Sequence, residues 1–191
     1  TAHWMMSDFA IWLAGGVSVP LYPTLAPATI SQILEHSGSK VLFVGKLDGW
    51  EHMKPGVPAA LPCISHPLSP DDAKRSYPRW DDIVAKTPPL EGNPTRPEND
   101  LSTIMYTSGT TGTPKGVMMT HDGVAHFGRV SAASRALGPQ DRSYAYVPMT
   151  HIFGLGTVLL ASLHAGAALV MRHQFEPADL LDALAHHGVS Q

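Results

Sequence analysis

The sequence predicts an α/β protein in which helices are layered on a mainly parallel sheet. Short apolar runs alternate with longer segments that carry apolar residues at helical spacing, and this alternation is typical of layered α/β folds. Residues 41–44 are continuously apolar, as expected for a parallel strand that is covered on both faces. The chain has 191 residues, of which 43% are hydrophobic, so it is long enough for one or two domains with a buried core.

The first 44 residues predict two helices and two strands. Residues 3–14 carry apolar side chains at helical spacing and precede two glycines, which predicts a helix that ends there. Residues 17–21 predict a strand that leads into a turn. A second helix is expected at residues 26–35, with its apolar side chains on one face and Gly38 after its end, and the strand at residues 41–44 follows it.

Residues 45–100 differ in character, because prolines are frequent there and long apolar runs are rare. We expect an irregular connection around one or two short strands, with one helix at residues 80–86 and a surface loop at residues 88–97. No chemistry is assigned to this segment.

The rest of the chain alternates strands and helices. Thr150 is a suitable N-cap for a helix that begins near His151, and Gly166 is a suitable end for it. Residues 143–171 lack charged side chains, but proline, histidine and glycine interrupt the run, so a buried strand–helix–strand unit explains it better than a membrane span. The predicted strands are residues 101–106, 117–119, 143–147 and 168–171, and the predicted helices are residues 122–137, 151–166 and 177–187.

Composition and charge argue against several classes of function. The formal net charge is −3 and no cluster of lysine and arginine forms a basic stripe, so we expect no nucleic-acid partner. Cys63 is the only cysteine, which rules out a disulfide within the chain and favours a reducing compartment, here expected to be the cytoplasm. The eleven histidines show no metal-binding spacing. Neither a signal peptide nor a transmembrane segment is expected, and peripheral association with a membrane stays open.

Residues 106–116, which read Tyr-Thr-Ser-Gly-Thr-Thr-Gly-Thr-Pro-Lys-Gly, have the composition of a phosphate-binding loop. Three glycines allow sharp turns and a close approach of the backbone to a ligand. Serine and threonine hydroxyls supply neutral donors, and Lys115 supplies a compact positive charge. Such a loop presents consecutive backbone N–H groups to an anion.

Two other interpretations of this run are less consistent with its surroundings. A flexible Gly/Ser/Thr linker has similar composition, but predicted strands flank the run on both sides. The P-loop of nucleotide triphosphatases requires Gly-Lys-Ser/Thr at the start of a helix. Here Pro114 precedes Lys115, Gly116 follows it, and the next residues are apolar and extended, so the loop is of a different kind.

The run, followed by Val117 and then by Thr120 and His121, resembles the signature of the adenylate-forming (AMP-binding) superfamily. That superfamily includes acyl-CoA synthetases, aryl-CoA ligases, luciferases and peptide-synthetase adenylation domains. The resemblance implies a part of the large N-terminal domain of an adenylate-forming enzyme. It also implies the activation of a small carboxylic acid with ATP and Mg²⁺, release of AMP and pyrophosphate, and transfer of the acyl group to CoA as co-substrate.

The resemblance implies roles for individual loop residues. Lys115 would neutralise the departing pyrophosphate, and the hydroxyls would donate hydrogen bonds to the β- and γ-phosphates. Thr107 would also help to coordinate magnesium. The expected nucleotide-binding residues are Thr107, Ser108, Gly109, Thr110, Thr111, Gly112, Thr113, Pro114, Lys115 and Gly116.

Residues 148–154 resemble the family segment in which a histidine or an aromatic residue borders the acyl pocket. His151 would then act near the reacting carboxylate, at a helix N-terminus whose dipole favours a neutral imidazole. A core histidine that is hydrogen-bonded to a backbone carbonyl is an equally open interpretation. Gly154 and Gly156 fit either room for a ligand or tight helix packing.

Parts of the family pattern are not found in this sequence. These are the aromatic-Gly-x-Thr-Glu segment, the ribose-binding aspartate, and the small C-terminal lid with its catalytic lysine. We therefore expect residues 1–191 to be a partial adenylation domain, an internal fragment that is inactive by itself. A non-catalytic truncated product is an open alternative.

The two parts of the chain resemble different branches of the superfamily. Residues up to His121 resemble long-chain fatty acyl-CoA synthetases, whereas residues from Asp122 onward resemble aryl- or medium-chain-CoA ligases. We expect a fatty acid as substrate, with the acyl length left open. The acceptor is expected to be CoA, with a carrier protein as the alternative.

Overall fold

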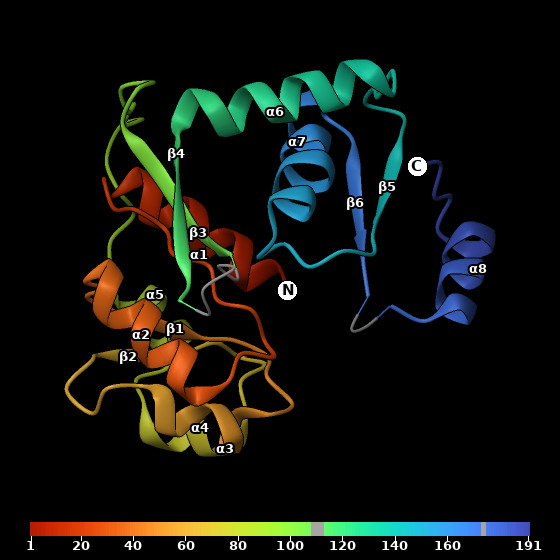
Figure 1. The fold of residues 1–191 in the computed structure, drawn as a ribbon. Coiled ribbons are helices and arrows are strands. Elements are labelled where there is room, and N and C mark those ends of the chain that lie inside the picture. Colours follow the sequence, from red (N-terminus) through yellow and green to blue (C-terminus); the bar gives the residue numbers. More distant parts are fainter. Residues whose placement is uncertain (108–112, 173–174) are drawn as a thin grey trace. The chain divides into compact units, whose positions relative to one another are not determined.

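The computed structural model describes residues 1–107, 113–172 and 175–191 (Figure 1). The chain forms two compact units. The first unit contains Thr1–Arg96 and Tyr106–Val117, and the second contains Pro97–Met105 and Met118–Gln191. Each unit is described by itself below.

Helices make up most of the regular structure of the first unit. Pro27 is suited to the start of α2, because the N–H that proline lacks would have no partner within the helix at this position. Gly38, with φ of 61°, ends the helix in the left-handed conformation. The predicted helices in this unit are confirmed, and α5 has the bounds expected from the sequence. The expectation of a single helix within residues 45–100 is wrong, because two further short helices precede α5. The helices are α1 (Ala2–Leu13), α2 (Pro27–Ser37), α3 (Trp50–Met53), α4 (Asp71–Ser76) and α5 (Trp80–Lys86), with a 3₁₀ turn η1 (Lys54–Gly56) after α3.

Two short parallel strands, β1 (Leu42–Val44) and β2 (Cys63–Ser65), form the sheet of the first unit. Leu42 pairs with Cys63 and Val44 with Ser65. The strand expected at residues 17–21 is wrong, since only Ser18 makes an isolated bridge there. Pro20 explains the failure, because proline has no N–H to donate to a ladder.

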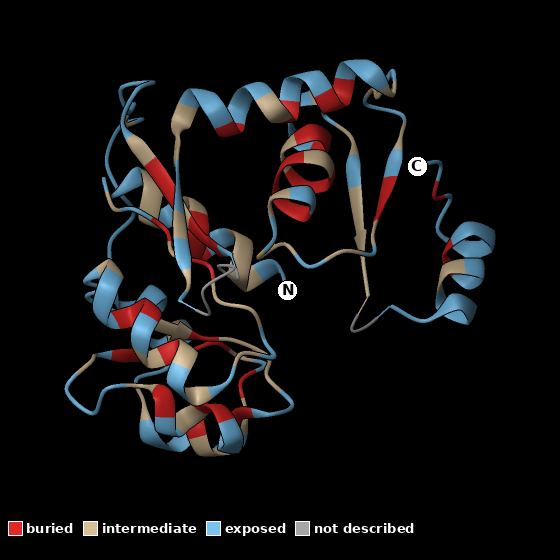
Figure 2. Ribbon diagram, in the orientation of Figure 1, coloured by how far each residue is buried: buried red, intermediate tan, exposed pale blue. Residues whose placement is uncertain are grey.

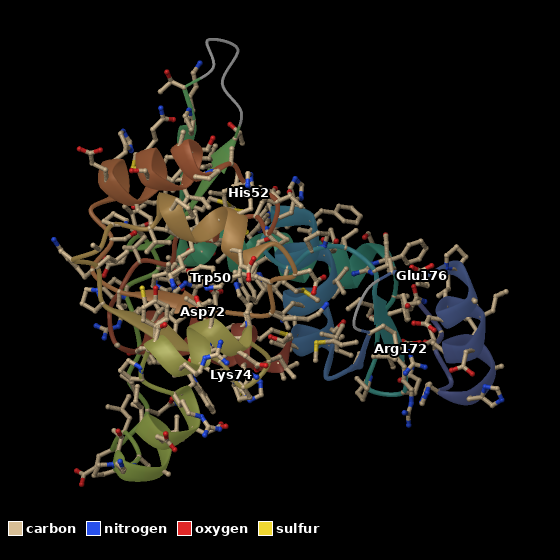
Figure 3. All side chains as sticks on the ribbon, turned by 90° about the horizontal axis from the view of Figure 1, so that it is seen from below. Trp50, His52, Asp72, Lys74, Arg172 and Glu176 are labelled. Carbon is tan, nitrogen blue, oxygen red and sulfur yellow. The ribbon has the colours of Figure 1, made fainter. Side chains whose placement is uncertain are left out.

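The hydrophobic core of the first unit lies between α2, α3, α4 and the two strands (Figure 2). The indole Nε1 of Trp50 donates to Asp72 Oδ2 at 3.3 Å, so that the largest core side chain has a polar partner (Figure 3). The Lys54 ammonium lies 2.8 Å from the same carboxylate oxygen. The buried core residues are Ile30, Leu34, Val44, Trp50, Met53, Cys63 and Ala73.

The buried face of α1 is polar, although its sequence predicted an apolar one. Ser7 and Asp8 are the residues of this helix that are buried. The Ser7 hydroxyl lies 2.9 Å from His66 Nε2, and the Ser18 hydroxyl donates to the Asp8 carboxylate. Burial raises the pKa of Asp8 from 3.8 to about 6. Burial also lowers the pKa of His66 from 6.5 to about 4, helped by the neighbouring His3 and the chain's amino group.

The second unit is built around a strand–helix–strand connection. Strands β5 (Arg142–Ala145) and β6 (Ala168–Met171) are parallel, with Arg142 opposite Ala168. Between them run the π-helix η2 (Phe153–Leu160) and α7 (Ala161–Ala165), which ends at Gly166 with φ of 69°. Both strands and the predicted end at Gly166 are confirmed. None of the described helices is long and apolar enough to cross a membrane.

Helices α6 (His121–Ser134) and α8 (Pro177–His186) complete the second unit. Thr120 is the N-cap of α6, since its hydroxyl accepts a hydrogen bond from the N–H of Gly123 at 3.1 Å. The helix expected at residues 122–137 is confirmed with an earlier end, at Ser134.

Strands β3 (Leu101–Thr107) and β4 (Lys115–Thr120) pair with each other and belong partly to each unit. The hydroxyl of Ser102 donates to the carbonyl of Met119 at 3.0 Å. Within the described residues the strands form three two-stranded sheets, of which β1–β2 and β5–β6 are parallel. The α/β class is confirmed. The parallel strand pairs β1–β2 and β5–β6 belong to separate short sheets.

Candidate nucleotide-binding site

The candidate phosphate loop connects the end of β3 to the start of β4. Thr107 is the last residue of β3, and Lys115 is the first residue of β4; both are exposed. Thr113, Pro114 and Gly116 are also described, with Thr113 exposed. The other predicted loop residues lie outside the described part of the chain, and they are Ser108, Gly109, Thr110, Thr111 and Gly112.

The residue before the loop is anchored in the first unit. Tyr106 is 7% exposed, and its hydroxyl oxygen lies 2.6 Å from Nδ1 of His36 in the last turn of α2. The two rings meet edge to face, with centroids 5.8 Å apart. Burial raises the pKa of Tyr106, so its hydroxyl keeps its proton at neutral pH. Sequence analysis missed this pair, because no local signal connects a helix end to a strand 70 residues away.

The Lys115 side chain is suited to bind an anion. It is exposed at the start of β4, and no ion pair involves it within residues 1–107, 113–172 and 175–191. An ammonium without a carboxylate partner keeps its full charge for an incoming polyphosphate. This arrangement fits the prediction that Lys115 faces phosphate. Where the nucleotide binds stays a prediction.

The magnesium prediction depends on Thr107 alone among the described residues. No group of three His, Cys, Asp or Glu side chains in the described ranges is arranged to hold a metal ion. Magnesium commonly keeps waters and binds substrate phosphates, with only one or two protein ligands. The exposed hydroxyl at the end of β3 therefore fits an auxiliary ligand of a phosphate-bound Mg²⁺.

His151 lies in the second unit, where its side chain caps a helix. Its Nδ1 accepts a hydrogen bond from the N–H of Phe153 at 3.1 Å. As the acceptor of this bond, Nδ1 carries no proton, which places the ring N–H at Nε2. The residue is exposed, so the interpretation as a core histidine is wrong. His151 lies at the N-terminal end of η2 as expected, and its role near the reacting carboxylate stays a prediction.

Thr150 does not cap the helix as expected. The π-helix begins at Phe153. Ile152 is in its N-cap position, and the Ile152 side chain makes no capping hydrogen bond. The continuous helical stretch begins at Ile152, next to the expected start near His151. Because His151 reaches the first N–H of η2, the cap is supplied by the imidazole. The Thr150 hydroxyl is buried and has no hydrogen-bond partner among the described residues.

The glycines beside His151 are required by packing. A Cβ atom at Gly154 would lie 2.2 Å from the carbonyl oxygen of Pro148, and one at Gly156 would lie 1.8 Å from Cδ1 of Phe127. Of the two interpretations left open by the sequence, tight helix packing is the one that these distances support. Stretches of π-helix are rare and are frequent at functional sites, which keeps this segment a candidate.

Comparison with known proteins identifies the family. The profile of the family described as AMP-binding enzyme matches residues 1–191. The chain belongs to the AMP-binding enzyme family. This result confirms the resemblance seen in residues 106–116.

Relatives of known activity in this family include several CoA ligases. The chain is 32% identical over 200 residues to the 3-[(3aS,4S,7aS)-7a-methyl-1,5-dioxo-octahydro-1H-inden-4-yl]propanoyl:CoA ligase of Mycobacterium tuberculosis, covering 100% of the chain and 38% of the relative. It is also 32% identical to the sulfoacetate–CoA ligase of Cupriavidus necator, covering 98% of the chain and 35% of the relative. The chain thus spans somewhat over a third of the length of these AMP-binding relatives.

Solved structures of AMP-binding enzymes have the same fold. The apo structure of MbtA from Mycobacterium smegmatis matches 100% of the chain and 36% of that protein, with a TM-score of 0.84 and 22% identity. The o-succinylbenzoate CoA synthetase MenE from Bacillus subtilis, in complex with its acyl-adenylate intermediate, matches 100% of the chain and 46% of that protein. Its TM-score is 0.72 and its sequence identity is 26%. The expected placement in the N-terminal domain of an adenylate-forming enzyme is confirmed.

Proposed function

We propose that the protein containing this chain uses ATP to activate a carboxylic acid as an acyl-adenylate and then transfers the acyl group to CoA. One observation carries the proposal. Lys115 is exposed at the end of a Gly/Thr-rich loop in a chain of the AMP-binding family, with no ion-pair partner among the described residues. The acid attacks the α-phosphate, AMP becomes attached to the acyl group, and pyrophosphate leaves.

The main obstacle to this reaction is electrostatic, because an anionic acid approaches an anionic nucleotide. Lys115 would offset the negative charge that builds on pyrophosphate as the bond to the α-phosphate breaks. Loop hydroxyls and backbone N–H groups would hold the β- and γ-phosphates in line with the attacking oxygen. Thr107 would supply one oxygen ligand to Mg²⁺, and the ion, when bound, would offset part of the negative charge of the phosphates.

His151 is proposed to border the carboxylate of the acid. Its Nδ1 accepts a hydrogen bond from the N–H of Phe153, so the acid would approach the Nε2 side of the ring. A neutral donor can orient a carboxylate oxygen without forming an ion pair that would weaken its nucleophilicity. In this proposal His151 orients the acid, and Lys115 acts on the phosphates.

A fatty acid is the proposed substrate, and CoA the proposed acceptor. The relatives act on acids of different sizes, including sulfoacetate and 4-coumarate, so the test needs a panel of fatty, aryl and short polar acids. Residues 1–191 are proposed as part of the adenylation domain, which would not complete the reaction without the remaining length that the relatives have. We place the reaction in the cytoplasm, because a single cysteine favours a reducing compartment.

The proposal is tested by acid-dependent exchange of pyrophosphate into ATP with the full-length protein. Exchange is expected with at least one acid in the panel, and Lys115→Ala should reduce it by at least about a hundredfold. Lys40→Ala removes another exposed lysine of the first unit and should leave exchange unchanged. Full exchange by Lys115→Ala would remove the loop from the mechanism. Thioester formation tested with free CoA and with carrier protein then identifies the acceptor.

A further inference from the structure

The Tyr106–His36 hydrogen bond joins the proposed phosphate loop to a helix outside it. Tyr106 directly precedes Thr107, the first residue of the loop, and its hydroxyl lies 2.6 Å from His36 Nδ1. Tyr106 is buried except for 7% of its surface, whereas His36 is exposed at the end of α2. The bond is therefore held between a core side chain and a surface one.

Helix α2 is a firm support for this bond. Ile30, Ile33 and Leu34 are at most 5% exposed, so the face of α2 that they form is fully packed. The helix ends at Gly38 in the left-handed conformation, which fixes the last turn and with it His36. The bond transmits the position of α2 to the ring of Tyr106.

We propose that His36 is a positioning residue for the phosphate loop, acting through Tyr106. The inference rests on the proposed function, since it assumes that the loop binds the β- and γ-phosphates of ATP. The ring of Tyr106 is buried and its hydroxyl is bonded to His36, so the pair would restrict the backbone of the next residue, Thr107. Less conformational freedom would then be lost at Thr107 when ATP binds.

The test uses the affinities of the full-length protein for ATP and for AMP, each with Mg²⁺, measured by calorimetric titration. AMP lacks the β- and γ-phosphates, so a loop effect changes the Kd for ATP only. His36→Ala should raise the Kd for ATP about threefold to tenfold, the range expected for one lost hydrogen bond, and leave the Kd for AMP unchanged. Unchanged AMP affinity also shows that the variant is folded.

Two further variants separate positioning from general stability. His36→Asn keeps an acceptor close to the place of Nδ1 and should restore most of the ATP affinity. Tyr106→Phe removes only the hydroxyl, so it should match His36→Ala, and the double variant should be no weaker than either single one. His52→Ala is the control, because His52 is another exposed helical histidine of the first unit.

The outcomes distinguish this inference from the proposed function. Equal losses for ATP and AMP, or no loss for His36→Ala, overturn the positioning role while the proposed function stands. Additive losses in the double variant overturn it as well, because they mean that the two side chains act separately. If the unaltered protein binds ATP no better than AMP and performs no exchange, the proposed function fails and this inference fails with it.

Discussion

Gly156 lies directly against the ring of Phe127, so that a Cβ atom on Gly156 would stand 1.8 Å from Cδ1 of the ring. Gly128, on the same helix as Phe127, repeats the arrangement with Leu160, whose Cβ would be 2.8 Å from a Cβ on Gly128. The two glycines let α6 and η2 approach closely. The segment that carries His151 is therefore held by glycine-mediated helix packing within the second unit.

Gly156→Ala should destabilise the protein by about 1–3 kcal/mol, because an added methyl group overfills a packed interface. Urea unfolding of the full-length protein measures the change. Gly49→Ala is the matched control: a Cβ there meets no atom within 4 Å and φ is −101°, so stability should change little. Equal stability of the two variants would contradict the packing argument.

Asp8 should make the protein less stable as pH rises through the range between 3.8 and about 6, the ordinary and native pKa values of its carboxyl group. Within this range the native state keeps a proton that the unfolded chain has released, so raising the pH favours unfolding. Asp8→Asn removes the titration and should relieve a cost on the order of 2–3 kcal/mol near neutral pH. Urea midpoints measured across the range check this, with the exposed Asp81→Asn as control.

His66 should make the protein more stable as pH rises, over nearly the same pH range in which Asp8 makes it less stable. Its pKa falls from 6.5 to about 4 in the native state, so the unfolded chain binds the extra proton and stability rises with pH between these values. The two groups then offset each other in the unaltered protein. His66→Gln, which keeps a partner for Ser7, should expose the falling profile of Asp8, whereas Asp8→Asn should expose the rising one. Parallel profiles for the two variants would contradict the assignment.

Two substitutions of His151 should separate its structural role as a helix cap from its proposed role beside the acid. His151→Ala removes the cap on the N–H of Phe153 and should cost about 0.5–2 kcal/mol of stability. His151→Asn retains an acceptor near Nδ1, so stability should recover, but it lacks the Nε2–H proposed to contact the acid. Exchange should stay low in both variants. Recovery of exchange together with stability in His151→Asn would reduce this residue to a helix cap.

Thr107→Ala should raise the Mg²⁺ concentration needed for half-maximal exchange about threefold to tenfold, because one hydroxyl ligand or hydrogen bond is lost. Thr107→Ser keeps the hydroxyl and should behave as the unaltered protein does. Thr95→Ala removes another exposed threonine and is the control. An unchanged magnesium dependence in Thr107→Ala would exclude this residue as a metal ligand.

Local signals were enough to predict most of the elements. The bounds of α5 and β6 agree with the sequence prediction, and Gly38 and Gly166 end their helices as expected. Each of these features depends on residues within a few positions of one another. The candidate loop was predictable for the same reason, since its glycines, hydroxyls and Lys115 are contiguous in the chain.

The sequence by itself determined the α/β class, most of the helices and strands, and the family signature. Only the tertiary structure decided which side chains meet: His36 with Tyr106, Ser7 with His66, and Gly156 with Phe127. It also decided that His151, and not Thr150, reaches the first N–H of η2. The physical reason is that periodicity and capping act over one or two turns, whereas these contacts join residues brought together when the elements pack.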